Sequence, residues 1–321
     1  MIRRFYIMPL NHRANAENVA RFIADYDACD MFIPGLMASA AGLDEANNTV
    51  VWENIFVDEE TYSGPYMTAP YHSSTLDSYL MADSPELLTH DIYTVRYEHD
   101  GEIPRIEQGI RRLVLMNLGE GTEEAARAAL AAPNCDVATA VFSADNVKWV
   151  SSKGRAWTHI LEQGFADREA LDRYLATPLG INTTSKDGMR RLGIDIDALK
   201  IFTYPFALKQ PQQPRPPVDD TPAYYAITAK LALGDVPAYI ALLEKHYDAH
   251  VGDNGGSLVQ RLRTVDEGYR EAEVQSIWQL PSMAAYSPMR FSTGGDANWL
   301  AYVNGALPLV RGGTRRFYRA V

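Results

Sequence analysis

An internal repeat is the feature that most constrains what this chain can fold into. Residues 3–10, RRFYIMPL, reappear almost in register as residues 111–118, RRLVLMNL. A third start, YYAITAKL at 224–231, follows a proline-rich break. A repeat of about this spacing is a small domain rather than one turn of a solenoid. The 321 residues are therefore expected to form three fused domains.

The first unit has the pattern of a split β-α-β. Strands are predicted at 3–10, 36–42, 49–57 and 91–98. A first helix is indicated by Val19, Phe22, Ile23 and Tyr26, which recur at helical spacing after the candidate N-cap Asn15. A second helix is expected over Tyr66 to Tyr79. The order β-α-β-β-α-β is the ferredoxin-like unit.

The other two units follow the same outline. We expect an α+β protein of three tandem ferredoxin-like repeats: repeat one at 1–100, repeat two at 109–208 and repeat three at 222–321. The segment 209–221, rich in proline, is expected to be an extended linker. Repeat two is predicted to hold a helix at 122–131, extended stretches near 137–143, 147–151 and 155–161, a second helix around 171–175 and a closing strand at 199–208. In repeat three, Asp235 is a candidate helix cap, and strands are expected at 273–280 and 314–321.

Each ferredoxin-like sheet has one face without helices, and such a face is usually buried against a second sheet. Three such faces cannot all pair within one chain. We expect repeats one and two to pair internally as a barrel. Repeat three is then expected to pair with its own copy in a homodimer, because an isologous contact satisfies the remaining face.

Composition excludes several classes of partner. The chain carries 30 basic and 41 acidic residues, a net charge of −11, so neither nucleic acid nor an anionic membrane is an expected partner. Cys29 and Cys135 are the only cysteines, and they lie in different repeats without a C-x-x-C motif. Two cysteines form no disulfide framework, so free thiols and a cytoplasmic location are expected.

A short motif in repeat one carries a family resemblance. Tyr66 to His72, YMTAPYH, is a Y-x3-P-x-H string that follows the acidic turn 58–60, and Ile33-Pro34-Gly35 lies upstream. Together these resemble the dimeric α/β barrel family in its stress-responsive and EthD-like branches, which include polyketide cyclases of the olivetolic acid type. Repeat two keeps Tyr174 and Pro178 but has Gly180 in place of the histidine; repeat three keeps only Tyr286 and Pro288 near the equivalent place.

The resemblance implies a cavity between helices and sheet, lined by apolar and aromatic side chains. Relatives use such cavities without organic cofactors for cyclisation, isomerisation or lyase chemistry on phenolic or polyketide-like substrates. Others bind and degrade haem. A small aromatic substrate is therefore the expected partner.

His72 and Tyr66 are the candidate catalytic residues. An imidazole takes and returns a proton near neutral pH, and a tyrosine hydroxyl donates a hydrogen bond to a developing enolate or phenolate oxygen. Such a pair suffices for an aldol-type, retro-aldol or isomerisation step. The alternative is that His72 only packs or caps the second helix.

Five further residues are candidates for substrate binding. Trp52 and Asn54 alternate onto one face of their strand, and Trp157 and His159 are taken as their counterparts in repeat two. An aromatic beside a polar group suits an aromatic ligand, although a tryptophan buried in a sheet interface gives the same pattern. His12, at the end of the first strand, is a candidate for the cavity mouth.

No metal or organic cofactor is expected. His246 and His250 have helical i, i+4 spacing, but no glutamate stands between them in the H-E-x-x-H manner, so a packed helix face is favoured. No phosphate loop, dinucleotide fingerprint or nucleophile elbow is present.

The sequence thus predicts a cofactor-independent lyase or cyclase. A haem-dependent or cofactor-free monooxygenase of the same fold, and a non-catalytic binding or assembly module, remain as alternatives.

Overall fold

A computed structural model describes residues 1–89, 92–98, 108–118, 157–194, 199–207, 222–264, 270–283 and 295–321, the strand segments 141–143 and 148–151, and positions 121, 124, 285, 286 and 289. The helix expected at 122–131, the linker 209–221, Cys135 and Pro288 lie wholly or mainly outside these residues.

Repeat one forms the β-α-β-β-α-β unit that the sequence predicts. Its strands are β1 (Ile2–Pro9), β2 (Leu36–Asp44), β3 (Thr49–Phe56) and β4 (Tyr93–Glu98). Helix α1 (Ala16–Asp27) begins at Asn15, whose side chain accepts from the amides of Glu17 and Asn18 in a capping box. A 3₁₀ turn, η1 (Cys29–Met31), follows it. The helix buries Val19, Phe22 and Tyr26 against the sheet. These are residues of the apolar stripe that the sequence predicts.

The second helix expected at Tyr66 to Tyr79 is instead a series of short pieces. These are α2 (Glu59–Ser63), α3 (Pro65–Thr68), α4 (Pro70–Ser74) and the 3₁₀ turn η2 (Leu76–Tyr79). Pro65 and Pro70 each occupy the first turn of a piece, where the missing N–H costs nothing but the preceding residue is pushed out of helical conformation. The two prolines therefore divide the segment.

Repeat two contributes the strands β5 (Gln108–Met116), β6 (Val141–Ser143), β7 (Lys148–Ser151), β8 (His159–Phe165) and β9 (Lys200–Ala207). Its helices are α6 (Arg168–Leu175), α7 (Pro178–Asn182) and α8 (Lys186–Arg191). The strand expected at 155–161 begins only at His159. The stretch near 147–151, for which repeat one offers no counterpart, is β7 and pairs with β4 of repeat one.

Repeat three begins with β10 (Ala223–Ala232) and the 3₁₀ turn η3 (Leu233–Asp235). Helix α9 (Val236–Leu242), a π-helical turn η4 (Leu243–Tyr247) and α10 (Asp248–Asp253) follow. The repeat closes with β11 (Ser257–Arg263), β12 (Glu271–Leu280), α12 (Ala297–Ala306) and β13 (Val310–Tyr318). Asp235 stands at the start of α9 but its side chain makes no capping hydrogen bond, contrary to expectation.

The strand order is the same in all three repeats. The sheets run β2-β3-β1-β4, β6-β8-β5-β9 and β11-β12-β10-β13, and every pairing is antiparallel. β7 is left out of this comparison because it joins the sheet of repeat one. With the four remaining strands of each repeat numbered in chain order, each sheet reads 2-3-1-4, which is the ferredoxin-like arrangement. The α+β fold with three ferredoxin-like sheets is thus confirmed.

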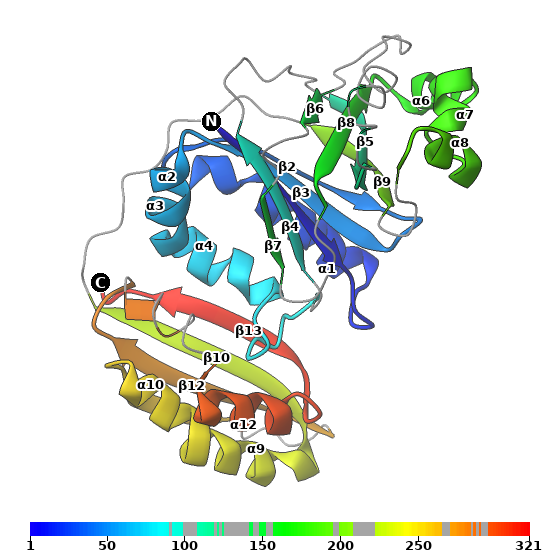
Figure 1. Ribbon diagram of the computed structural model, residues 1–321. Coiled ribbons are helices and arrows are strands. Elements are labelled where there is room, and N and C mark those ends of the chain that lie inside the picture. The colour runs from blue at the N-terminus through cyan, green and yellow to red at the C-terminus, as the bar shows by residue number, and fades with distance from the viewer. Residues whose placement is uncertain are drawn as a thin grey trace.

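The sheets of repeats one and two pack face to face, with helices on their outer sides (Figure 1). Their shared core contains Phe5, Ile7 and Val51 from one sheet and Leu113, Ile160 and Phe202 from the other. This is the internal pairing expected for these two repeats.

At both edges of this pair of sheets, a strand of one repeat lies beside a strand of the other. At one edge β7 joins β4. At the other, β2 lies beside β9: the amide of Thr203 donates to Asp44 (2.8 Å), and a side chain at Gly42 would collide with the carbonyl oxygen of Pro205. Glycine is therefore required at position 42 by the close approach of the two strands.

Repeat three lies against the helical side of repeat one, with β13 next to α4 and its own helices α9, α10 and α12 on one side of the sheet (Figure 1). No helix among the described residues is both long and apolar enough to cross a membrane.

Candidate functional site

The candidate site of repeat one lies between its sheet and its helices. Tyr66 stands in α3 and His72 in α4, so the break at Pro70 sets the angle between them. Their ring centroids are 4.2 Å apart, and the two side chains are 2% and 6% exposed. The structure thus brings the predicted catalytic pair into contact.

Arg4 completes the site and was not predicted. It lies on the helix-facing side of β1, fully buried, and donates from Nη2 to the hydroxyl oxygen of Tyr66 (2.7 Å). Its guanidinium carbon lies 4.7–5.1 Å from the ring centroids of five aromatic side chains, those of Tyr6, Trp52, Phe56, Tyr62 and Tyr66. An arginine in such a setting stays charged and is attracted by the ring faces.

The contact with Arg4 fixes the role that Tyr66 can play. Burial raises the pKa of Tyr66, and Arg4 opposes that shift without cancelling it, so the phenol keeps its proton at neutral pH. Because the oxygen already accepts from Arg4, its own O–H remains to donate. Tyr66 is therefore a neutral hydrogen-bond donor backed by a positive charge.

Trp52 and Asn54 also belong to this group. Both point to the helix side of β3, where Asn54 is directly opposite Arg4 in the register. The Trp52 indole donates to Ser39 (2.7 Å), which fixes the ring beside Arg4. Asn54 is fully buried, and neither its amide nitrogen nor its oxygen has a hydrogen-bond partner in the described part of the chain. A buried amide without partners is a group that a ligand oxygen or N–H can satisfy.

Repeat two contains the equivalent arginine and tyrosine, and both make hydrogen bonds within the repeat. Arg112, the counterpart of Arg4, donates to the side-chain oxygen of Gln163 (2.6 Å) and to the carbonyl of Thr183 (2.7 Å). The Tyr174 hydroxyl, which corresponds to that of Tyr66, lies 3.2 Å from the Thr183 hydroxyl. Burial lowers the pKa of Arg112 to about 10, so the group is still charged at neutral pH. Repeat two thus satisfies its buried arginine internally.

The amide side chains opposite the two arginines differ in length by one methylene. The register places Gln163 opposite Arg112 as Asn54 is opposite Arg4. Gln163 is long enough to reach its arginine, whereas Asn54 is not bonded to Arg4.

The counterparts proposed for repeat two were wrong by four residues. The register equates Trp52 with Leu161 and Asn54 with Gln163. Trp157 precedes β8 and packs in the core between the two sheets, edge-on to Tyr93. His159 lies at the start of β8 beside Thr158.

His12 lies exposed in the turn after β1. The structure therefore groups Tyr66, His72, Trp52 and Asn54, and does not bring His12, Trp157 or His159 into that group.

The histidine pair of repeat three packs as expected for a helix face. His250 is buried and pairs through Nδ1 with Asp296, while His246 faces Asn298 (3.3 Å). No cluster of three potential metal-ligating side chains occurs among the described residues.

Comparisons with known proteins give distant structural similarity. No protein-family model matches the chain, and no curated sequence matches it significantly. An anthrone oxidase-like protein is similar over 66% of this chain and 94% of its own, at 12% identity and a TM-score of 0.46. A NIPSNAP family protein from Agrobacterium tumefaciens is similar over 33% of this chain and 92% of its own, at 15% identity and a TM-score of 0.28.

A third structure, provisionally named a monooxygenase and from Lactobacillus acidophilus, is similar over 68% of this chain and 99% of its own, at 10% identity and a TM-score of 0.37. At these scores the similarities transfer no activity to this chain, and the fold stands on the strand order itself.

Proposed function

We propose that repeat one is the catalytic unit of a cofactor-independent lyase or cyclase that acts on a phenolic or polyketide-like small molecule. The observation that carries the proposal is the contact of Arg4 with Tyr66 beside the ring of His72. The three groups supply a proton acceptor, a neutral donor and a fixed positive charge within one buried site.

The step that these groups support is enolisation followed by carbon–carbon bond formation. His72 takes a proton from the carbon next to a substrate carbonyl, while Tyr66 donates to that carbonyl oxygen as it becomes an enolate. Arg4 stabilises the negative charge through Tyr66. The enolate carbon then attacks a second carbonyl, and the His72 imidazolium returns the proton to the new alkoxide. The sequence is redox-neutral, and its reverse is a retro-aldol cleavage.

The test is proton exchange at an enolisable position. The protein is incubated in deuterium oxide with a phenyl-substituted 1,3-diketone, and loss of the proton signal is followed by NMR. We expect Tyr66→Phe to slow exchange by about 10²-fold and His72→Ala by about 10²- to 10⁴-fold, the usual effects of losing an oxyanion donor and a general base. Tyr174→Phe, the matched change in repeat two, should leave the rate unchanged. Equal effects of the two tyrosine changes would refute the assignment to repeat one.

A second candidate function uses the same acid–base pair. A substrate carbanion formed at His72 can reduce dioxygen and, with the proton returned by the imidazolium, form a carbon-bound hydroperoxide. Loss of water then leaves a carbonyl, so that one oxygen atom stays in the product and the other leaves as water, as in a cofactor-free monooxygenase. Oxygen uptake that depends on His72 and on the substrate would select this function, and a Soret band in purified protein would select the haem-dependent form. If the protein shows neither proton exchange nor oxygen uptake, the alternative of a non-catalytic binding or assembly module would be favoured.

We also propose that the chain forms a homodimer through repeat three. The face of its sheet opposite the helices has no sheet of this chain packed on it among the described residues, in contrast to repeats one and two. Exposed apolar side chains lie on its strands, including Leu262 (43%) and Tyr318 (51%). A second copy would cover them, as the first two repeats cover one another.

A further inference from the structure

The guanidinium of Arg4 is enclosed by aromatic rings, so part of this enclosure has to move before a substrate can reach it. Three of the five surrounding side chains are at most 2% exposed. Tyr6 is held in β1, which pairs with a strand on each side. The fifth ring belongs to Tyr62, which is partly exposed and lies outside the sheet, in α2. Tyr62 thus separates the buried guanidinium from solvent on the helical side.

Helix α2, which carries Tyr62, lies on the surface. None of its five residues is buried. Its start is capped by Asp58, whose side chain accepts from the amide of Thr61 (2.8 Å), and it ends at Gly64, directly before Pro65 of α3. Small residues at the ends of elements often absorb the backbone changes of a hinge. Gly64 can therefore serve as the joint between α2 and α3.

An ion pair and ring contacts hold α2 in place. Arg96, in β4, pairs with the carboxylate of Glu59 at the start of α2. The guanidinium carbon of Arg96 also lies 4.9 Å from the ring centroid of Tyr62. The Tyr62 ring in turn stacks on that of Tyr66, with centroids 5.9 Å apart and planes inclined by 16°. Because the Glu59 side chain is 53% exposed, this ion pair is solvated and easily broken.

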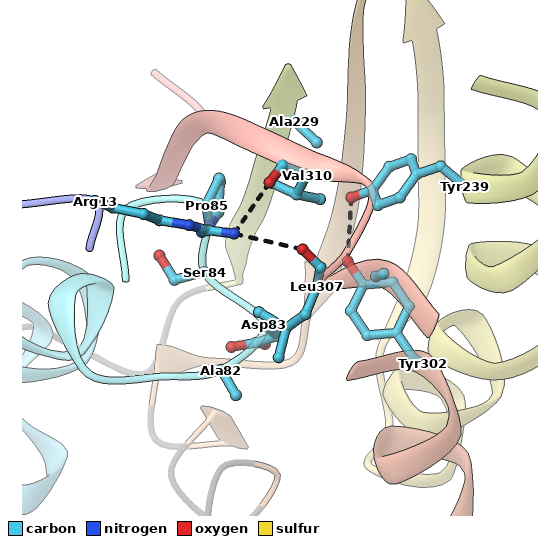
Figure 2. Close-up of a pocket in the computed structure, with 11 residues that line it drawn as sticks. Arg13, Ala82, Asp83, Ser84, Pro85, Ala229, Tyr239, Tyr302, Leu307 and Val310 are labelled. Carbon is cyan, nitrogen blue, oxygen red and sulfur yellow. Dashed lines mark hydrogen bonds between the residues drawn. The ribbon is translucent and has the colours of Figure 1, made fainter. Parts of the chain in front are cut away.

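The opposite end of the broken helical segment is fixed to repeat three. Helix α4 lies next to β13, whereas α2 is at the end of the segment away from repeat three (Figure 1). The loop after η2 enters repeat three, where Asp83 accepts from the hydroxyl of Tyr247 (2.6 Å). Figure 2 shows this loop beside Arg13, which donates to the carbonyls of Leu307 (3.4 Å) and Val310 (3.0 Å). Movement of the segment is therefore easiest at α2.

We propose that Tyr62 is the gate of the repeat-one site and that Arg96, through Glu59, is the latch that holds this gate closed. The substrate enters when α2 turns outward about Gly64 and the Tyr62 ring leaves the guanidinium of Arg4. Arg96 is in this sense a positioning residue, since it acts through Tyr62 and Glu59. The inference rests on the proposed function, because it concerns entry to the site on which that function depends.

Repeat two provides an internal reference for this gate. Its matching tyrosine, Tyr174, lies in the continuous helix α6, in which Ala170 and Leu171 are also buried. Arg112 is as buried as Arg4, each being 1% exposed. Access to Arg112 should therefore not depend on α2.

The experiment is modification of the full chain with phenylglyoxal, a small aromatic reagent for guanidinium groups. Fragment-ion mass spectrometry separates Arg4 from Arg3, and the initial rate at Arg4 is divided by the rate at Arg112 in the same sample. We expect Glu59→Gln to raise this ratio about 2- to 5-fold, the scale of losing a partly exposed ion pair. Tyr62→Ala removes the gate itself and should raise the ratio more than Glu59→Gln does.

Matched variants separate the gate from general destabilisation. Tyr62→Phe keeps the ring and should leave the ratio unchanged. Arg96→Lys keeps the charge, so it should raise the ratio less than Arg96→Met. Glu169→Gln removes an exposed ion pair with Arg173 in α6 and should have no effect. A variant that only loosens the whole protein raises both rates and leaves their ratio as it is in the wild type.

The inference is overturned if either Glu59→Gln or Tyr62→Ala leaves the ratio at its wild-type value, or if Glu169→Gln raises it as much. The assay measures access to Arg4 and needs no catalysis. A gated Arg4 in a protein without proton exchange would therefore contradict only the proposed function. Proton exchange in a protein whose Arg4 is not gated would contradict only this inference.

Discussion

Arg4 and Arg112 occupy equivalent positions. They differ in whether the amide side chain on the opposite strand bonds to the arginine. Gln163 bonds to Arg112, whereas Asn54 is too short and stays unpaired. The difference is a single methylene in a position buried in both repeats. Repeat two also has Gly180 in the place of His72 and Leu161 in the place of Trp52.

Asn54→Gln tests this point directly. We expect the longer amide to reach Arg4 and to close repeat one, so that exchange activity falls at least as far as in Tyr66→Phe. Satisfying buried polar atoms should raise the free energy of unfolding by about 1–3 kcal/mol. Urea unfolding and the exchange assay measure the two effects, and a variant that is more stable yet fully active would contradict this role of Asn54.

The reciprocal change supplies the control. Gln163→Asn should leave Arg112 short of one partner and lower the free energy of unfolding by about 1–3 kcal/mol, the cost of an unsatisfied buried donor. Exchange in repeat one should not change. A neutral effect on stability would mean that Thr183 alone satisfies Arg112.

At the residue scale the sequence revealed only part of the site. Tyr66 and His72 are close in sequence, so their motif brings them together on adjacent turns. Arg4 was read only as a marker of the repeat. The signal was present, since an arginine at an alternating position in an apolar strand must be buried and paired. Trp157 was matched to Trp52 by residue type, but only the strand register shows that Leu161 is the counterpart.

At the scale of elements, the broken helical segment of repeat one covers its candidate site. Tyr66 and His72 are nearly inaccessible, and both lie on pieces of only four and five residues, α3 and α4. Such short helices gain little from internal hydrogen bonding and depend on packing. The prolines that divide them are plain in the sequence, although the sequence analysis expected one helix over Tyr66 to Tyr79.

This segment is expected to open for substrate. Amide hydrogen exchange of 59–74 should be faster than that of β3, because β3 is a fully buried central strand. A saturating diketone ligand should slow exchange in the segment and leave repeat three unchanged. Equal protection of the segment and β3, in the absence of ligand, would show that access occurs elsewhere.

Helix α12 carries a pH-dependent contact at its start. Asp296 accepts from the amides of Asn298 (2.8 Å) and Trp299 (3.0 Å) and pairs with His250. Burial acts to raise the pKa of Asp296, but the His250 contact and the helix amides outweigh it, and the pKa is lowered below its ordinary value of 3.8. A carboxyl with a lowered folded-state pKa stabilises the fold above its unfolded value, and that stability is lost as pH falls through the folded value.

Asp296→Asn should therefore reduce stability at neutral pH and flatten its decline below about pH 4, the range in which an unperturbed aspartate titrates. Asparagine keeps the oxygen that caps α12, so the change removes mainly the charge. Urea unfolding at a series of pH values compares the two proteins. Parallel curves would show that the Asp296 charge has no share in the acid sensitivity.

At the scale of the whole molecule, a buried ionic network joins repeats one and two. Glu53 accepts from Arg3 (3.1 Å) and Arg111 (3.1 Å), and Glu162 accepts from Arg3 (2.7 Å) and from the hydroxyl of Tyr97. All these side chains are at most 2% exposed. The sequence showed the paired arginines but not their partners, because pairing across two sheets depends on how whole repeats pack.

Removing one charged partner from this network should strongly destabilise the protein. Glu162→Gln leaves Arg3 with a deficit of buried negative charge, and we expect a loss of about 3–5 kcal/mol in the free energy of unfolding. The double variant Arg3→Met with Glu162→Gln removes both charges and should recover part of that loss. A double-mutant cycle with no coupling between the two positions would show that the network contributes no pairing energy.

Among the described residues, no second sheet packs on the open face of the sheet of repeat three, and the homodimer proposed for this face can be tested by introducing charge. Leu262 lies opposite Gln275 in the register, while its neighbour Arg261 bonds to Ser276 on the helix side, so Leu262 points to the open face. Leu262→Asp combined with Tyr318→Asp should convert a dimer into a monomer in sedimentation velocity at micromolar concentration, because two buried carboxylates per copy would lie unpaired in the interface.

Leu300 in α12 supplies the control. It is similarly exposed (42%) but lies on the helical side, so Leu300→Asp should leave the dimer intact. A monomeric wild-type protein, or a dimer lost only with Leu300→Asp, would show that the open face of repeat three is not the dimer interface.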